Sequence, residues 1–202
     1  MNNINLKGII KNIEPSHVIQ GIEFSKANLI VKRSDGKEDV LNIRFKKFSN
    51  PYEDNQEVTL CGNVRSYSSR LDDGKNKVDL YIFTYFDQPE LNSEDQEDIN
   101  QVTLDGRICK IESLRVTKNG KHNIHLILAN NLIVSDGKKK LNSYVPCIAW
   151  GNEAIELSKL PINTKLMLEG ELHSREYKKN LPDGTFEFRV AHECVIKSFS
   201  VI

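Results

Sequence analysis

The chain contains the stretch Tyr144-Val-Pro-Cys-Ile-Ala-Trp-Gly151, in which large and small apolar side chains alternate. Successive side chains of a β-strand point to opposite faces, so Tyr144 and Trp150 share one face. Val145, Cys147 and Ala149 are small enough to fill a core on the other face. An exposed aromatic face can stack on flat, π-rich ligands, such as the bases of single-stranded nucleic acid. The alternative is that the aromatic side chains form the core and the small ones face a second layer.

The rest of the sequence is typical of an all-β protein. Its 202 residues leave room for one large domain or for two domains of roughly 100 residues. Short alternating runs of Val, Ile, Leu, Tyr and Phe are separated by Asn, Asp, Gly and Ser. No apolar run is long enough to span a membrane, and the N-terminus lacks the order of a signal peptide. The four cysteines are scattered without a Cys-x-x-Cys pair, so we expect buried thiols and a cytoplasmic protein.

Charge is unevenly distributed, although the net charge is zero. Residues 1–86 carry 13 Lys and Arg against 11 Asp and Glu, and residues 102–202 carry 15 against 11. Between them, residues 87–101 carry 6 acidic residues and no Lys or Arg. The sequence therefore predicts two mildly basic domains, 1–86 and 102–202, joined by a solvated acidic linker, 87–101. This charge permits a phosphate partner without requiring one.

The two predicted domains repeat one pattern. A strand with a glycine near the start, a later strand with a glycine, and an Asp-Gly turn before the last strand occur in the same order in both. The matching segments are 4–14 with 102–112, 58–66 with 166–174, and 73–74 with 183–184. A duplication explains this agreement better than chance.

Each copy is predicted to hold about five strands. In the second copy they lie near 102–116, 122–135, 142–150, 165–178 and 185–199. A short helix is expected within 151–161, capped by Asn152 and stopped by Pro161. Three strands, a helix and two strands is the order of the OB fold, a five-stranded Greek-key barrel. The first copy has a short segment broken by Pro51 in place of the helix, where we expect a loop over 48–57.

The sequence thus predicts an all-β chain of two tandem OB-fold barrels, with a short helix in the second. Glycines in the first and fourth strands of each copy fit the sharp coiling that closes a small barrel, where a side chain would obstruct. These glycines are Gly8, Gly62, Gly106 and Gly170.

The second copy has the aromatic and cationic residues that a nucleic-acid-binding face requires. Leucines alternate inward along 166–172, so parity sends Arg175 and Tyr177 to the outer face, beside Tyr144 and Trp150. Lys and Arg side chains in the flanking loops can meet phosphates. They are Lys138, Lys139 and Lys140 before the third strand, Lys178 and Lys179 in the last hairpin, and Arg115, Lys118 and Lys121 around the first hairpin. Lysine-rich hairpin tips often serve solubility alone, so the combination with three aromatic residues carries this hypothesis.

The first copy offers a poorer face. Apolar side chains at 41, 43 and 45 alternate with Asn42, Arg44 and Lys46, and no Tyr or Trp stands where Tyr144 does. Phe45 is expected to belong to the core. The remaining candidates for nucleic-acid contact in this copy are Arg65, Tyr67 and Arg70. The first copy is therefore interpreted either as an auxiliary binder or as an assembly module.

Catalytic and metal-binding patterns are absent from the sequence. His122 and His125 are three residues apart, which on a strand places them on opposite faces and makes them a poor metal pair. No glycine-rich phosphate loop follows a strand, and there is no nucleophile elbow. We expect a protein that is not an enzyme and needs no cofactor.

The second copy resembles the bacterial single-stranded DNA-binding protein family. The resemblance covers most of this copy and the first copy only loosely. The matching features are Tyr144, the pair Trp150-Gly151, Glu153 and Ala154 in the short helix, the strand 166–177 and the hairpin into 186–190. Aromatic residues at the positions of Tyr144, Trp150 and Tyr177 stack on bases in that family, so the resemblance implies the same role here.

Two features depart from the family. Its housekeeping members carry an acidic, phenylalanine-tipped tail that recruits other proteins, whereas this sequence ends just after the last predicted strand, so recruitment by that route is not expected. Pro146 within the third strand limits hydrogen bonding there to an edge or a bulge. The family usually assembles four OB folds, so two per chain imply a homodimer.

The prediction is a nucleoid-associated protein that binds single-stranded DNA, largely without sequence preference, in replication, repair, recombination or mobile-element transfer. RNA remains an alternative to DNA, since no residue pattern reveals contacts to the 2′-hydroxyl. The other alternative is an assembly module of a primosome-like or secretion-associated complex, in which the aromatic residues anchor a protein interface.

Overall fold

The structure is a computed structural model of the chain, and it describes residues 1–47, 52–70, 76–84, 99–134, 139–181 and 183–202. The first half of the chain forms a closed five-stranded barrel. Its strands are β1 (Asn2–Ile19), β2 (Ile22–Lys32), β3 (Glu38–Lys46), β4 (Glu57–Arg70) and β5 (Asn76–Thr84). β1 pairs with both β2 and β4, β2 pairs with β3, and β5 closes the barrel between β3 and β4, parallel to the former.

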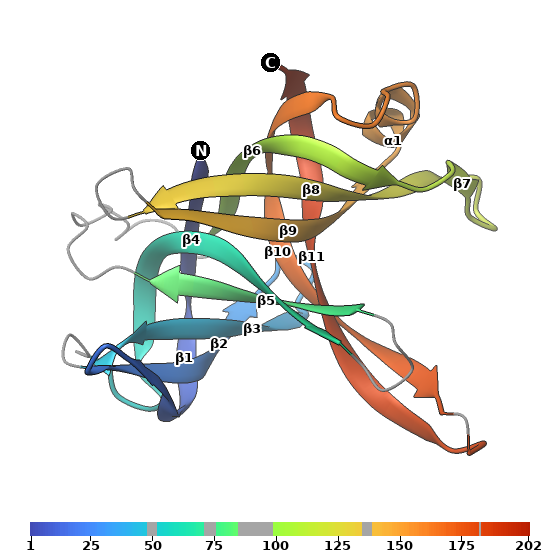
Figure 1. Ribbon diagram of the computed structural model, residues 1–202. Coiled ribbons are helices and arrows are strands. Elements are labelled where there is room, and N and C mark those ends of the chain that lie inside the picture. Colours follow the sequence, from blue (N-terminus) through green and yellow to red (C-terminus); the bar gives the residue numbers. More distant parts are fainter. Residues whose placement is uncertain (48–51, 71–75, 85–98, 135–138, 182) are drawn as a thin grey trace.

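The second half repeats this barrel. Its elements are β6 (Asn100–Ile111), β7 (Arg115–Val116), β8 (His122–Val134), β9 (Lys139–Trp150), α1 (Asn152–Leu157), β10 (Lys165–Asn180) and β11 (Phe186–Val201). β6 pairs with β8 and β10, β8 pairs with β9, and β11 lies between β9 and β10, parallel to the former. Both halves thus have the same strand order, and the predicted fold of two OB barrels is confirmed. Figure 1 shows the barrels one above the other, with α1 on the second.

The predicted alternation in the β9 strand is confirmed on its core side. Val145, Cys147 and Ala149 are at most 1% exposed. Ile148 alternates with these core residues and so lies on the face of Tyr144 and Trp150, yet it is buried. Its neighbours His125 on β8 and Val195 on β11 flank it on both sides, and such cross-strand pairs lie on the same face of a sheet.

Other local expectations need correction. Asn152 is the first helical residue, and the cap position is Gly151, with φ 65° and no side-chain hydrogen bond. The predicted first strand of the second copy is interrupted after Ile111 and resumes as the short β7. Lys139 and Lys140 lie within β9, not in a loop before it.

Some expectations fall partly or wholly on residues outside the described ranges. The loop predicted over 48–57 lies partly outside them, and its described part, 52–56, contains no helix. Most of the predicted linker lies outside them too, so the domain boundaries stay a prediction. Among the cysteines, Cys109 is exposed, contrary to the expectation of buried thiols.

The four barrel glycines stand where the chain passes close to a facing strand. A Cβ on Gly8, Gly62, Gly106 or Gly170 would lie closer than 3.0 Å to a carbonyl oxygen of that strand. At Gly170 the oxygen belongs to Val195 on β11, close to a bulge in β11, where Glu169 pairs with Ser198 and Gly170 with Ile196. Backbone cannot move aside as a flexible side chain can, which explains why these positions hold glycine.

Replacing Gly170 with alanine is expected to destabilise the second barrel by about 1–3 kcal/mol, the usual cost of overpacking a tight interior. Urea unfolding followed by circular dichroism measures this change. Glu169→Ala is the matched control, since Glu169 is the exposed neighbour on the same strand. A loss within about 0.5 kcal/mol of the control, the range of ordinary surface substitutions, would contradict the clash.

The two barrels are joined through their first strands. β1 pairs antiparallel with β6, with Ile4 opposite Val102. These residues match in the sequence repeat, so the pairing relates the barrels by an approximate two-fold axis. Asn2 exchanges side-chain hydrogen bonds with the backbone of Val64 at 2.7 and 2.8 Å, and Asn100 does the same with Leu172 at 2.8 and 2.9 Å. The same bridge therefore recurs in both barrels.

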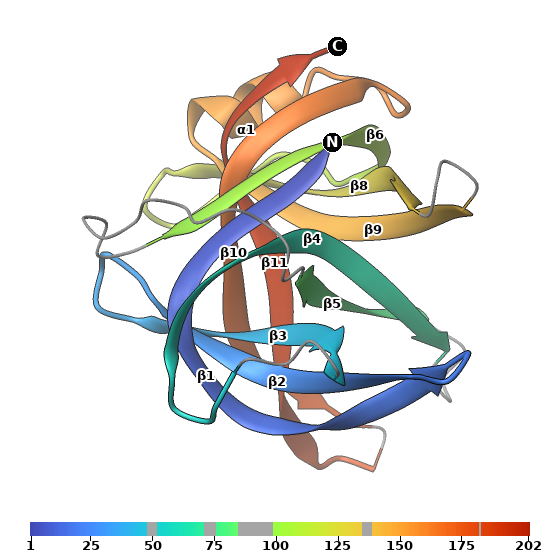
Figure 2. The ribbon, with the colours of Figure 1, turned by 90° about the vertical axis from the view of Figure 1, so that its left-hand side faces the viewer.

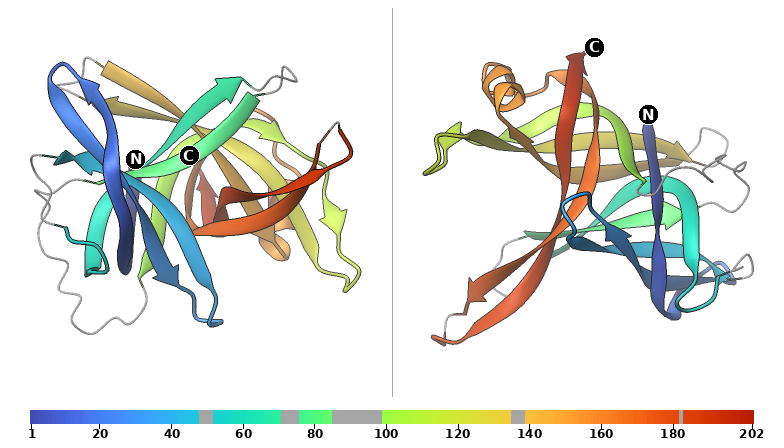
Figure 3. Two further views of the ribbon diagram at one scale, coloured as in Figure 1. Left: turned by 90° about the horizontal axis from the view of Figure 1, so that it is seen from below. Right: turned by 180° about the vertical axis from the view of Figure 1, so that it is seen from behind.

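The β10–β11 hairpin is the main departure from this symmetry. It runs from the second barrel past the first and projects beyond it (Figures 1 and 2). Its projection is also clear from below and from behind (Figure 3). Residues of this hairpin therefore lie beside strands of the other barrel, which positions the surfaces described next.

Candidate nucleic-acid interface

The outer face of the second barrel carries the two aromatic residues of β9. Tyr144 is 42% exposed, and Trp150 is half-buried at the end of the strand. The Lys121 ammonium lies over the Trp150 ring, with Nζ 5.3 Å from its centroid, a cation–π contact. A base that stacks beside this indole would therefore have a cation next to it.

Arg115 and Lys118 flank the same end of the barrel. The Arg115 guanidinium pairs with the Glu112 carboxylate at 2.7 Å, and Lys118 is exposed in the turn that follows β7. Exposed ion pairs of this kind contribute little free energy, so a phosphate can replace the carboxylate at small cost.

The predicted residues of the hairpin form a second group. Arg175 and Tyr177 line a groove of about 610 Å³ together with Pro146 of β9. The Arg175 guanidinium carbon is 5.7 Å from the Tyr177 ring centroid, and Arg175 Nε lies 3.6 Å from a Glu193 carboxylate oxygen. Pro146 alternates to the same face of β9 as Tyr144, but neither Tyr144 nor Trp150 lines this groove.

The predicted lysines are less concentrated. Lys178 and Lys179 line the same groove, and Lys178 Nζ is 3.7 Å from the Phe186 ring centroid. Lys140 is exposed and alternates to the face of Tyr144. Lys138 lies outside the described residues, and the structure fixes only the backbone of Lys139 within β9.

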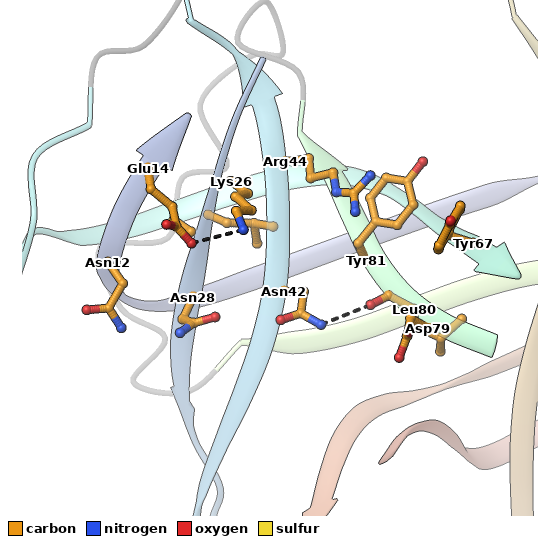
Figure 4. Close-up of a pocket in the computed structure, with 12 residues that line it drawn as sticks. Asn12, Glu14, Lys26, Asn28, Asn42, Arg44, Tyr67, Asp79, Leu80 and Tyr81 are labelled. Atoms are coloured by element: carbon orange, nitrogen blue, oxygen red, sulfur yellow. Dashed lines mark hydrogen bonds and ion pairs between the residues drawn. The ribbon is translucent and has the colours of Figure 1, made fainter. Parts of the chain in front are cut away.

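The first barrel presents a face that the sequence underrated. Figure 4 shows Arg44 and Tyr81 side by side, with Tyr67 next to them. Arg44 Cζ is 4.3 Å from the Tyr81 ring centroid, and Tyr67 is 55% exposed. Arg65 Cζ is 3.9 Å from the centroid of the Phe83 ring, which is buried beneath this face. Cations and aromatic rings therefore alternate across three strands of this barrel.

Two residues of this face, Tyr81 and Arg44, were not predicted from the sequence, and one predicted residue, Arg70, does not lie on it. Tyr81 and Arg44 could have been found, because both alternate with core residues in their strands, and the repeat aligns their strands with those of the second barrel. Arg70 alternates to the opposite face from Arg65 and Tyr67 in β4.

Comparison with known proteins bears on this arrangement. The model of the single-strand binding protein family matches residues 99–200. The chain belongs to this family. No curated protein sequence matches the chain.

Two solved structures of a single-stranded DNA binding protein are similar to the whole chain. The wild-type single-stranded DNA binding protein from Thermus aquaticus is 18% identical, with a TM-score of 0.72, over 100% of this chain and 93% of that one. A deletion mutant of the Thermus aquaticus protein gives a TM-score of 0.70 at 18% identity, over 100% of this chain and 94% of that one. At this identity the likeness concerns the fold, and it extends over both barrels.

The junction between the barrels in this family member contains a buried carboxylate. Asp39 is fully buried and accepts hydrogen bonds from Arg33 Nε at 2.7 Å, from Arg33 Nη2 and from the Ser174 amide of the hairpin. Arg33 Nη2 also donates to the Ser174 carbonyl at 2.9 Å. The hydrogen bond to Asp39 raises the pKa of Arg33. The junction is therefore held by charge-assisted hydrogen bonds.

A pair of symmetric contacts completes this junction. The Ser174 hydroxyl accepts from the Val40 amide at 2.9 Å, and the Ser66 hydroxyl accepts from the Tyr144 amide at 2.7 Å. Each serine lies four residues after a barrel glycine and contacts the third long strand of the other barrel. The amide of Tyr144, a candidate stacking residue, is thus fixed by the first barrel.

Glu171 on β10 is bonded to two neighbouring side chains. Burial alone would raise the pKa of Glu171, but hydrogen bonds from His173, at 2.9 Å, and from Lys197, at 3.2 Å, hold this pKa below its ordinary value.

Within the described ranges, no cluster of three or more His, Cys, Asp or Glu could hold a metal ion. No helix among the described residues is long and apolar enough to cross a membrane.

Proposed function

We propose that this chain binds single-stranded DNA, largely without sequence preference, by stacking bases on Tyr144, Trp150 and Tyr177. Lys and Arg side chains of the second barrel hold the phosphates. The observation that carries the proposal is the exposed aromatic face of β9 with Lys121 over Trp150, in a chain of the single-strand binding protein family. Stacking of this kind contributes about 1–3 kcal/mol per base.

The biological setting of the proposal is the protection of single strands during replication, repair, recombination or mobile-element transfer. Association of two chains into a homodimer with four OB folds belongs to the same proposal. Catalysis has no part in it, because stacking and phosphate contacts need no reacting group.

A titration with oligo-dT tests the proposal directly, because Trp150 is the only tryptophan in the sequence. We expect saturable quenching of its fluorescence that weakens steeply as salt rises, since phosphate binding releases counterions. The absence of binding at low salt would refute the proposal. A surface that instead bound a protein with little salt dependence would favour the assembly module.

A further inference from the structure

Two buried cysteines lie side by side where the second barrel closes. In the described chain, β11 pairs with β9 in parallel at two positions, Cys194 with Cys147 and Val195 with Ile148 (Figure 1). Cys147 is 1% exposed and Cys194 is fully buried. Paired residues of neighbouring strands lie on the same face of a sheet, so both thiols point into the core of this barrel.

The spacing of the two strands suits a disulfide. Neighbouring strands are about 4.7–4.9 Å apart, and Cα atoms joined through a disulfide are usually about 4.4–6.8 Å apart. The pairing of Cys147 with Cys194 therefore places their Cα atoms within the range that a disulfide requires. A disulfide can form here without any rearrangement of the strands.

The two side chains already interact as thiols. The contact with the Cys194 side chain and burial together raise the pKa of Cys147 well above its ordinary value. The Cys147 thiol also donates a hydrogen bond to the Val145 carbonyl oxygen at 3.3 Å. Cys147 is therefore held as a protonated thiol while the barrel is closed.

The first barrel has isoleucines at the same place. β3 and β5 close that barrel in parallel, and Ile43 pairs with Ile82 there. The symmetric serine contacts match Val40 with Tyr144, which stand three residues before Ile43 and Cys147. Both isoleucines are at most 1% exposed. Close packing at this position thus needs no sulfur, yet the second barrel holds two thiols there.

We propose that Cys147 and Cys194 are a reversible disulfide site, oxidised by a peroxide or a small-molecule disulfide and reduced by thiols. With hydrogen peroxide, two S–H bonds and the O–O bond break, one S–S bond forms, and two molecules of water are released. The two sulfur atoms together lose two electrons, which the peroxide gains. The disulfide joins β9 to β11 covalently and so locks the closure of the second barrel.

Oxidation requires the barrel to open at this edge. A buried thiol with a raised pKa is a poor nucleophile, because the thiolate is the reacting form. The pairing of β9 with β11 is short, whereas β9 pairs with β8 along residues 123–134. Separation of β9 from β11 therefore breaks few hydrogen bonds and exposes both sulfur atoms to water and oxidant. The site reacts slowly in the closed barrel and faster as opening becomes more frequent.

Peptide mapping tests the site on the wild-type protein. The folded protein is incubated with hydrogen peroxide at several urea concentrations below its unfolding transition, and free thiols are then alkylated in denaturant. We expect a linked pair of peptides that contains Cys147 and Cys194, and we expect dithiothreitol to separate it. The link should form faster as the urea concentration approaches the transition, since opening exposes the thiols.

Locking the closure should also make the oxidised protein more stable. A disulfide between residues 147 and 194 closes a long loop and constrains the unfolded chain, so the midpoint of urea unfolding should rise by about 1–2 M. Dithiothreitol should reverse this shift. Circular dichroism measures the midpoint in the oxidised and the reduced protein.

Two variants serve as controls. Cys109→Ala removes an exposed thiol and should leave both the link and the shift in midpoint unchanged. Cys147→Ala should abolish both, and its unfolding curve shows whether it folds. The peptide map of the wild type does not depend on either variant.

The outcomes are distinct. Absence of the link between Cys147 and Cys194 after peroxide treatment overturns the proposal, and so does a link that leaves the urea midpoint unchanged. Both measurements use the protein without DNA, so their result is independent of the proposed function.

Discussion

Asp39→Ala is expected to lower the free energy of unfolding by about 3–5 kcal/mol, because it removes one partner of a buried ion pair. The Arg33 guanidinium, whose side chain is only 21% exposed, would keep its charge without the carboxylate that now balances it. The Ser174 amide would lose its acceptor, and a buried unsatisfied donor costs about 1–3 kcal/mol. The loss of unfolding free energy should lie at the lower end of the range of about 3–5 kcal/mol, because Arg33 retains some contact with solvent.

Asp35→Ala is the matched control for this loss. Asp35 is the same residue type four positions earlier, but it is exposed and pairs with Lys37 at 3.2 Å. Exposed pairs are worth about 0–1 kcal/mol, so the control should stay within that range. Equilibrium unfolding in urea gives both values. Equal losses in the two variants would show that the buried carboxylate does not stabilise the junction.

Hydrogen exchange would locate the effect of Asp39→Ala. The Ser174 and Val40 amides, which are bonded at the junction, should lose protection if the hairpin detaches from the first barrel. Amides in the strand pairing between β1 and β6 should retain theirs, because that contact does not involve Asp39.

Much of the fold follows from the sequence because its signals are local. Alternation identified Val145, Cys147 and Ala149 as core, and the repeated glycines marked the places where strands nearly touch. Both signals depend on geometry within one strand or one barrel. They therefore do not depend on how the two barrels are arranged relative to each other.

The junction could not be predicted in the same way. Asp39 lies in an acidic stretch at the start of β3, where a sequence pattern indicates a solvated carboxylate. Its burial depends on the β10–β11 hairpin, which comes from residues far along the chain. The symmetric serines Ser66 and Ser174 did carry a signal, since the repeat aligns them, but their partners lie across the junction.

The candidate site was predicted only in part for a related reason. Sequence parity placed Tyr144 and Tyr177 on the outer surface, but it treated each barrel alone. Tyr81 and Arg44 come together because β5 lies beside β3, and these two strands are distant in sequence. A first barrel that looked poorer in sequence thus presents the more closely interleaved set of rings and cations.

Trp150→Ala is expected to weaken binding of single-stranded DNA by about 1–3 kcal/mol, which corresponds to roughly 5-fold to 150-fold in Kd. The indole is the largest ring on the β9 face, and the loss would also leave Lys121 without the ring it now covers. Trp150→Phe keeps a smaller ring and should recover part of the affinity. The variants lack the intrinsic reporter, so anisotropy of labelled oligo-dT measures their binding.

Two further variants assign this loss to stacking. Lys121→Ala should reduce affinity less than Trp150→Ala but should flatten the salt dependence, because it removes a cation and not a ring. Lys159→Ala is its matched control, since Lys159 is exposed on the second barrel but bonded to Glu156 at 2.6 Å, in the segment after α1. Trp150 is half-buried, so unfolding curves must show that the alanine variant folds. A folded Trp150→Ala protein that binds within twofold of the wild type would contradict a stacking role, and Tyr144 would then be the aromatic residue to test on this face.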